Sequence, residues 1–118
     1  MITLYGIPSC DTMKKARQWL ANHDIDYVFH DYKKSGVPEK ELKQWVKQLG
    51  WESLLNRNGT TWRKLDELLK KNINQTNVIK LMLENPSIIK RPVLDMNGQL
   101  LIGFSDETYQ KIFEKKQR

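Results

Sequence analysis

The sequence contains few of the residues that mark a disulfide framework, a metal centre or a membrane segment. Its 118 residues include a single cysteine, Cys10, which excludes a disulfide within the chain and fits a reducing compartment. The two histidines, His23 and His30, show no metal-ligand spacing, so we expect no bound metal or cofactor. No apolar run has bilayer-spanning length, and residues 1–4 lack the features of a signal peptide. We therefore expect a cytoplasmic protein with no membrane contact.

Positive charge is in excess, but it is spread along the chain. The sequence has 20 Lys and Arg residues against 14 Asp and Glu residues, a net charge of +6. Basic pairs such as Lys33-Lys34 and Lys70-Lys71 are scattered and mixed with acids, a pattern typical of solvated helix faces. No recognition module for nucleic acid is visible. We expect no direct nucleic-acid binding, whereas a cationic surface favours an anionic ligand or an acidic partner.

Strand signals lie near the two ends of the chain, and the first group predicts a β-α-β unit. Ile2–Tyr5 is a short apolar, β-rich run, and Gly6 and Pro8 end it. Helix formers follow from Thr12 to about Asn22, and strand character returns in Ile25–Tyr32. The two strands of such a unit should be parallel, with a right-handed crossover.

The second group of strand signals predicts a β-hairpin. Val93–Met96 and Gln99–Phe104 are apolar runs on either side of Asn97-Gly98, the strongest short-range hairpin signal. Ser105 is placed to cap a final helix. The order at this end of the chain is therefore β-β-α.

Helical signals fill the stretch between the two groups. Helices are expected to begin at Pro38, at Thr60 or Thr61, and at Asn74 or Thr76. The second helix should carry Leu68 and Leu69 on its apolar side. The length predicts one domain, 1–118, with a helical insertion at about 38–86. We predict an α/β, thioredoxin-like fold in which the β-α-β and β-β-α units form a mixed four-stranded sheet.

Cys10 is the main candidate for chemistry, because it lies at or beside the start of the first helix. Unpaired backbone N–H groups and the positive end of the helix dipole meet there. Both favour the thiolate, which is the reactive form of cysteine. Lys14 lies on the same helix face and could add a positive charge. The alternative is that Cys10 is only a small buried hydrophobic residue.

Arg91-Pro92, directly before the third strand, is the second candidate. A proline is tolerated where a strand begins, and one interpretation is that Pro92 has no other role. In thioredoxin-like folds, however, a proline at this place is commonly cis and faces the reactive cysteine. Pro92 would then expose backbone for an extended thiol peptide. Arg91 would bring a permanent charge, suited to carboxylates and other anions, near Cys10.

Four segments together resemble the arsenate reductase (ArsC)-like superfamily, and within it the Spx/MgsR subgroup with its YffB-like members. They are TLYGIPSCDTMKKA, LLNRNGTTWRKL, NPSIIKRPV and LIGFSDETY. The resemblance covers essentially the whole chain in family order. It implies a thioredoxin-like fold with a helical insertion, Cys10 as the redox-active thiol and Pro92 as the cis proline.

The chain departs from two branches of that superfamily. Arsenate reductases hold their oxyanion with several arginines. Here Arg91 matches one of them, Arg57 is offset by one residue with Arg63 as a second candidate, and the late arginine is replaced in the Gly103-Phe104 region. Spx regulators carry a C-x-x-C switch, but the position three residues after Cys10 is Met13. Arsenate reduction and an internal disulfide switch are therefore both disfavoured.

The resemblance leaves two function classes open. The first is a thiol-dependent reductase in which Cys10 forms a mixed disulfide and glutathione, as co-substrate, resolves it. Its anion site would comprise Arg91, Pro92, Lys14 and Arg57 or Arg63, and would take glutathione or another small thiol or oxyanion. The second is a non-catalytic, Spx-like regulator that binds the RNA polymerase α subunit or another protein partner.

Overall fold

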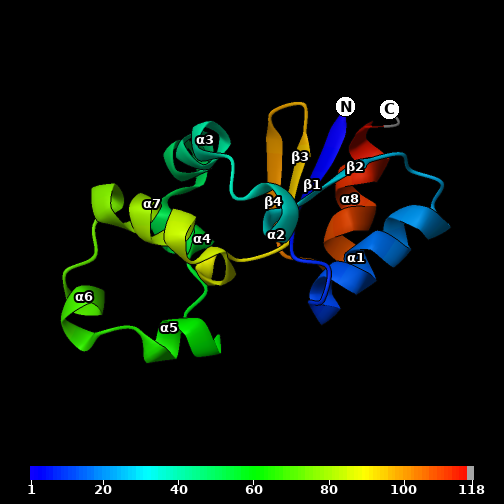
Figure 1. Cartoon of the computed structure of the whole chain (residues 1–118). Coiled ribbons are helices and arrows are strands. Elements are labelled where there is room, and N and C mark those ends of the chain that lie inside the picture. The colour runs from blue at the N-terminus through cyan, green and yellow to red at the C-terminus, as the bar shows by residue number, and fades with distance from the viewer. Residues whose placement is uncertain (117–118) are drawn as a thin grey trace. The chain divides into compact units, whose positions relative to one another are not determined.

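The computed structural model describes the backbone of residues 1–116 and the side chains of residues 1–114. The last two residues of the predicted domain lie outside this range. The chain divides into two compact units, shown in Figure 1. The first contains Met1–Asp31 and the segment from Arg91 onward, and the second is Tyr32–Lys90.

The first unit contains a mixed four-stranded sheet, as the sequence predicts. Its strands are β1 (Ile2–Gly6), β2 (Val28–Asp31), β3 (Val93–Met96) and β4 (Gln99–Ile102), arranged in the order β2-β1-β3-β4. β1 is parallel to β2, whereas the β1–β3 and β3–β4 pairs are antiparallel. This α/β arrangement is thioredoxin-like, which confirms the predicted fold class.

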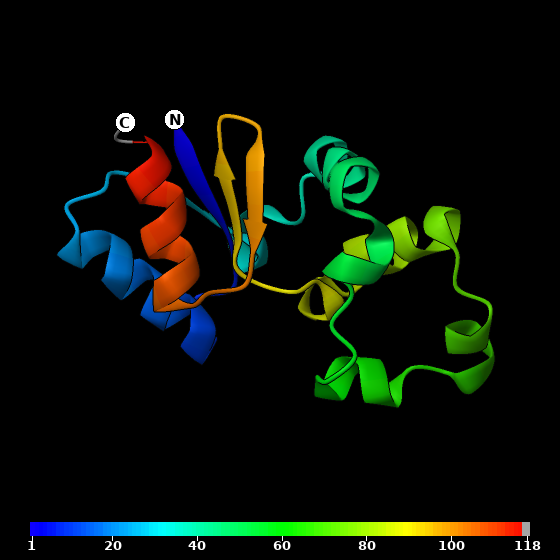
Figure 2. The same ribbon diagram turned by 180° about the vertical axis from the view of Figure 1, so that it is seen from behind.

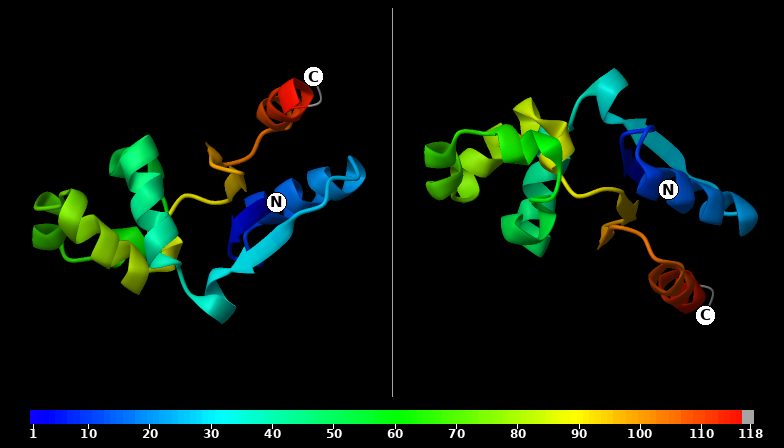
Figure 3. Two further views of the ribbon diagram at one scale, coloured as in Figure 1. Left: turned by 90° about the horizontal axis from the view of Figure 1, so that it is seen from above. Right: turned by 90° about the horizontal axis from the view of Figure 1, so that it is seen from below.

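Two helices, α1 (Asp11–Asn22) and α8 (Asp106–Lys116), pack on one face of this sheet. Leu4 and Leu94 are direct cross-strand partners, and both are fully buried in the same core cluster as residues of α1 and α8. The two helices lie side by side in Figures 1 and 2, and the ring centroids of Trp19 and Phe113 are 5.5 Å apart. Figure 3 looks nearly along both α8 and the hairpin, so this helix runs roughly along the strand direction.

The β3–β4 hairpin turns at the predicted residues. Asn97 has a φ of 57° and Gly98 a φ of 100°, the left-handed values that a two-residue hairpin turn needs. The Gly98 N–H also donates to Asp95 Oδ1 over 2.8 Å. Ser105 caps α8 as predicted, because its Oγ accepts from the Thr108 N–H at 3.1 Å.

The second unit is helical. Its elements are α2 (Tyr32–Ser35), α3 (Glu39–Leu49), α4 (Trp51–Leu54), α5 (Thr60–Lys64), α6 (Glu67–Lys71), α7 (Gln75–Glu84) and the 3₁₀ turn η1 (Pro86–Ile88). Pro38 is the N-cap of α3 rather than its first residue. Asn74 caps α7 in a reciprocal capping box with Asn77, which stabilises the start of that helix.

The single helix predicted from Thr60 or Thr61 through Leu69 is wrong, because the structure has two short helices there. The backbone is extended at Leu65, with ψ 151°, and Asp66 starts α6 by accepting from the Leu68 N–H at 3.3 Å. An aspartate at this point favours a new N-cap over helix continuation. Leu68 and Leu69, expected on an apolar side, are 67% and 44% exposed.

The helices and the metal-ligating residue types agree in having no membrane or metal feature within residues 1–116. Within residues 1–116, every helix is too short or too polar to pass through a lipid bilayer. In the same part of the chain, no three His, Cys, Asp or Glu side chains gather where they could hold a metal ion. His23 instead stacks on Trp19, with ring centroids 3.8 Å apart.

Candidate active site

Cys10 lies where the first strand passes into the first helix. β1 ends at Gly6, and a tight turn follows in which the Cys10 N–H donates to the Ile7 carbonyl at 3.3 Å. Cys10 is then the N-cap of α1, with extended backbone, and its carbonyl accepts from the Lys14 N–H at 3.0 Å. The sequence folds this way because Gly6 and Pro8 end the strand while Met13 and Ala16 begin a buried helical stripe.

The environment of the sulfur favours the thiolate. Burial raises the pKa of the Cys10 thiol, but the backbone N–H groups of Met13 and Thr12 and the Arg91 guanidinium lower it by more. The Cys10 side chain makes no capping hydrogen bond. The two N–H groups therefore stabilise the thiolate through electrostatic attraction to its negative charge. The pKa therefore falls below that of an ordinary thiol, in the direction that the helix position predicts.

Cys10 also remains accessible, which bears on the alternative that it is only a core residue. It packs against the buried cluster under the sheet, yet its own exposure is intermediate and it is a free thiol. A cysteine that is only partly covered and faces N–H groups and a cation differs from an inert, fully buried one. The arrangement therefore supports nucleophilic chemistry at the sulfur.

Arg91 begins the second segment of the first unit. Its guanidinium lowers the pKa of the Cys10 thiol, both as a hydrogen-bond donor and as a positive charge. The Arg91–Pro92 peptide bond is cis, as the resemblance implies. The Pro92 carbonyl accepts from the Gly103 N–H at 2.8 Å. One lone pair of this carbonyl is therefore already used, and the role of Pro92 in binding an extended thiol peptide stays a prediction.

The remaining predicted residues are placed differently. Lys14 is exposed on α1, and its backbone N–H, rather than its ammonium group, is bonded to Cys10. Arg57 and Arg63 belong to the second unit. Both are exposed, Arg57 in the loop after α4 and Arg63 on α5. The roles of these three residues in anion binding stay predictions.

Sequence reasoning did not single out the residues whose backbone faces the sulfur. Thr12 and Met13 supply the two N–H groups, and only the general rule that a helix start has unpaired donors pointed to them. The sequence predicts for Gly6 only that it ends the first strand. Its lack of a side chain also gives the Met13 thioether its space, and a glycine at a strand end is a known sign of close approach.

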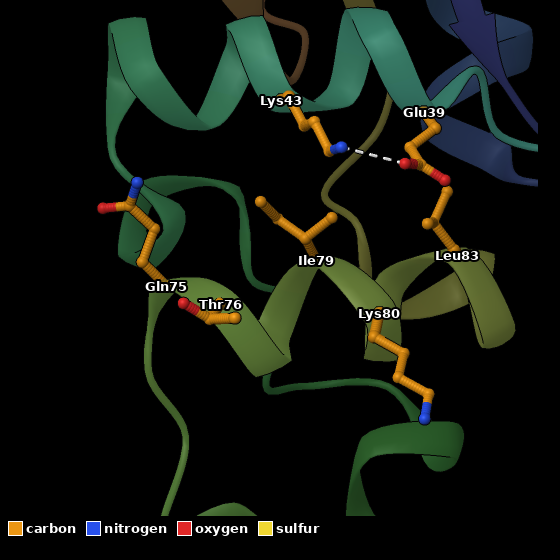
Figure 4. Close-up of a pocket in the computed structure, with 7 residues that line it drawn as sticks. All are labelled: Glu39, Lys43, Gln75, Thr76, Ile79, Lys80 and Leu83. Carbon is orange, nitrogen blue, oxygen red and sulfur yellow. Dashed lines mark ion pairs between the residues drawn. The ribbon is translucent and has the colours of Figure 1, made fainter.

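A separate hollow of about 420 Å³ lies between α3 and α7 in the second unit. Figure 4 shows its lining residues, with Ile79 and Leu83 between the polar side chains. Lys43 Nζ is 2.9 Å from Glu39 Oε2 across its rim. Its lining includes neither a cysteine nor a histidine, and the candidate site is the one around Cys10.

Known proteins resemble this chain in sequence and in fold over most of its length. The profile of the ArsC family matches residues 5–112. The solved structure of a YffB protein superposes with a TM-score of 0.90 at 50% identity, covering 94% of this chain and 97% of that one. An uncharacterised protein from Haemophilus influenzae is 46% identical over 96% of this chain and 99% of its own length.

A more distant relative has a described role. The global transcriptional regulator Spx of Streptococcus pyogenes is 28% identical over 100% of this chain and 89% of its own length. The family profile covers most of the chain, including Cys10, Arg91 and Pro92. The chain belongs to the ArsC family.

Proposed function

We propose that this protein is a thiol-disulfide reductase that uses the Cys10 thiolate alone and is resolved by glutathione. The observation that carries the proposal is the placement of the sulfur. It is partly exposed at the start of α1, with the N–H groups of Met13 and Thr12 and the Arg91 guanidinium lowering its pKa. A low pKa raises the fraction of thiolate at neutral pH and makes Cys10 a better leaving group in the second step.

The reaction has two exchange steps. The Cys10 thiolate attacks the glutathionyl sulfur of a mixed disulfide, the S–S bond breaks, and the substrate leaves as a thiolate that takes a proton from water. The thiolate of a second glutathione then attacks the Cys10–glutathione disulfide. This releases oxidised glutathione and restores the Cys10 thiolate. The net reaction converts the mixed disulfide and one reduced glutathione into the substrate thiol and oxidised glutathione, one half of which comes from the mixed disulfide.

Arg91 gives this reaction a preference for anionic thiols. Glutathione carries two carboxylates, and a guanidinium binds a carboxylate through two parallel N–H donors. Because Arg91 already faces the sulfur, a carboxylate bound to it would lie close to the reacting disulfide. The Arg91 guanidinium would then both bind the glutathione carboxylate and stabilise the Cys10 thiolate.

The same site is poorly equipped for arsenate. The resemblance puts the late arginine of arsenate reductases in the Gly103-Phe104 region, and Gly103 is bonded to Pro92 next to the site. A glycine and a phenylalanine bring no charge there. An arsenate bound beside Cys10 would lack one of its cations, which weakens binding and transition-state stabilisation.

Likeness to Spx supports a second candidate, a regulator that binds a protein partner. The alignment with the Streptococcus pyogenes regulator spans the whole chain, and the partner implied is the RNA polymerase α subunit. In this role Cys10 would be dispensable. The Met13 side chain replaces the second cysteine of the C-x-x-C switch, so any regulation could not depend on an internal disulfide.

Mass spectrometry after incubation with oxidised glutathione separates the two candidates. The reductase predicts one glutathione adduct, formed rapidly at neutral pH, which is absent in Cys10→Ala and removed by reduced glutathione. Turnover is then followed with a glutathionylated peptide. Lack of adduct and turnover in the folded protein would contradict the reductase. Binding of the RNA polymerase α subunit by both wild type and Cys10→Ala would then support the regulator.

A further inference from the structure

Gly6 and Met13 are in close contact beneath the turn that carries Cys10. A Cβ atom added at Gly6 would lie 2.3 Å from Met13 Sδ and 2.8 Å from Met13 Cε. Ordinary contacts between such atoms need about 3.5–4.0 Å. The Met13 thioether therefore occupies the space that any other residue at position 6 would fill.

Met13 connects this contact to the reactive sulfur. Its side chain is fully buried in the core cluster formed by the sheet, α1 and α8. Its backbone N–H is one of the two that lower the pKa of Cys10. Position 13 therefore couples core packing directly to the electrostatics of the thiolate.

The hydrogen bonds around the turn restrict how far Gly6, Cys10 and the first turn of α1 can move relative to one another. The Cys10 N–H is bonded to the Ile7 carbonyl and the Lys14 N–H to the Cys10 carbonyl, while Gly6 pairs with Asp31 in the sheet. Strand end, turn and first helical turn are thus linked. If repacking of the Met13 side chain moved its backbone by about 1 Å, its N–H would turn away from the sulfur, and hydrogen-bond strength falls steeply with such misalignment.

We propose that the Gly6–Met13 contact is the positioning device for the Cys10 thiolate, an inference that rests on the proposed reductase chemistry. Gly6 and Met13 touch no substrate and are positioning residues. The missing side chain at position 6 lets Met13 bury fully, and the buried Met13 holds the first turn of α1 against the end of β1. The N–H groups of Met13 and Thr12 are thereby kept facing the sulfur before any substrate arrives.

The test measures the pH dependence of alkylation by iodoacetamide, followed by mass spectrometry. Because Cys10 is the one cysteine, every adduct reports on it. The first variant is Gly6→Ala, which displaces the Met13 thioether. The second is Met13→Ala, which removes the buried side chain. Met13→Leu conserves buried volume. Should Met13→Ala fail to fold, Met13→Val removes fewer atoms and takes its place.

Met96→Ala is the matched control. Met96 is 4% exposed in the same core cluster, but it pairs with Ile2 at the opposite end of β1 from Cys10. Met96→Ala also truncates a buried methionine and lowers stability by leaving a cavity in the core, as Met13→Ala does. It leaves the turn between Gly6 and Met13 intact.

We expect Gly6→Ala and Met13→Ala to slow alkylation about fivefold at a pH below the midpoint, because the thiolate loses part of the stabilisation that the Met13 N–H gives to its charge. Met13→Leu should alkylate like wild type, and Met96→Ala should lose thermal stability without losing rate. Equal effects of Met13→Ala and Met96→Ala on the midpoint, or none from Gly6→Ala, would overturn the positioning role. A wild-type midpoint at the ordinary thiol value would instead count against the proposed reductase.

Discussion

Replacing Arg91 should raise the pKa of Cys10 and slow its reactions at neutral pH. Arg91 lowers this pKa both by a hydrogen bond and by its charge. Arg91→Met keeps most of the aliphatic length of a side chain that is half-buried and removes both effects. The two backbone N–H groups stay in place and continue to oppose the effect of burial, which raises the pKa.

The magnitude follows from the exposure of the sulfur. A hydrogen bond to a charged group is worth about 1.5–3 kcal/mol in general. Cys10 is only partly buried, and solvent screening reduces the value of such contacts, so we take about 1 kcal/mol. This corresponds to an alkylation rate about fivefold lower at a pH below the midpoint.

Arg91→Lys separates the two contributions. Lysine keeps the positive charge but not the planar fork of donors, so its alkylation rate should fall between wild type and Arg91→Met. The assay is iodoacetamide alkylation from pH 4 to 10, with intact mass as readout and thermal unfolding as the control for folding. A midpoint in Arg91→Met equal to that of wild type, or a lysine variant slower than the methionine variant, would refute the reasoning.

Three further predictions concern stability. Since the thiolate is favoured in the folded state, the unfolded state binds more protons between the lowered and the ordinary pKa. The free energy of unfolding of wild type relative to Cys10→Ser should therefore rise with pH in that window and level off above about pH 8.5; a flat difference by urea denaturation would contradict this. Asn74→Ala removes the N-cap of α7 and should cost about 1 kcal/mol, with unchanged stability in the same assay as the contrary result. Trp19→Phe removes the 2.6 Å hydrogen bond from Trp19 Nε1 to Asp106 Oδ1 and should cost about 2 kcal/mol; an equal loss in an Asp106→Ala background, which has no acceptor, would show that the bond is not responsible.

Local signals in the sequence were enough to predict the sheet. The Asn97-Gly98 turn and the punctuation at Gly6 and Pro8 act over a few residues, so neighbouring residues alone determine them. The extent of β2 was overestimated. Thr3 of β1 pairs with Val28, and the backbone turns through a positive φ at Asp24, so residues 25–27 are not in the strand, although Ile25 and Tyr27 are strand formers.

The site was predictable in kind but not in detail. Placement at a helix start is a local property, so the lowered pKa of Cys10 follows from the sequence around it. Its meeting with Arg91, 81 residues later in the chain, followed from resemblance to a known family and not from pattern. The contact between Gly6 and Met13 is tertiary packing, and no periodicity or turn rule indicates which side chain fills the space beside a glycine.

The division of the chain has a consequence for how the protein is synthesised. The first unit is interrupted by a continuous block, Tyr32–Lys90, and its central strand β1 pairs on one side with β3, which follows that block. A ribosome adding about 5–20 residues per second needs roughly 3–12 s to make those 59 residues. During that interval β1 has one edge unpaired because β3 has not been made, and Cys10 lacks the charge of Arg91. The nucleophile therefore becomes fully activated only after the second unit has been synthesised.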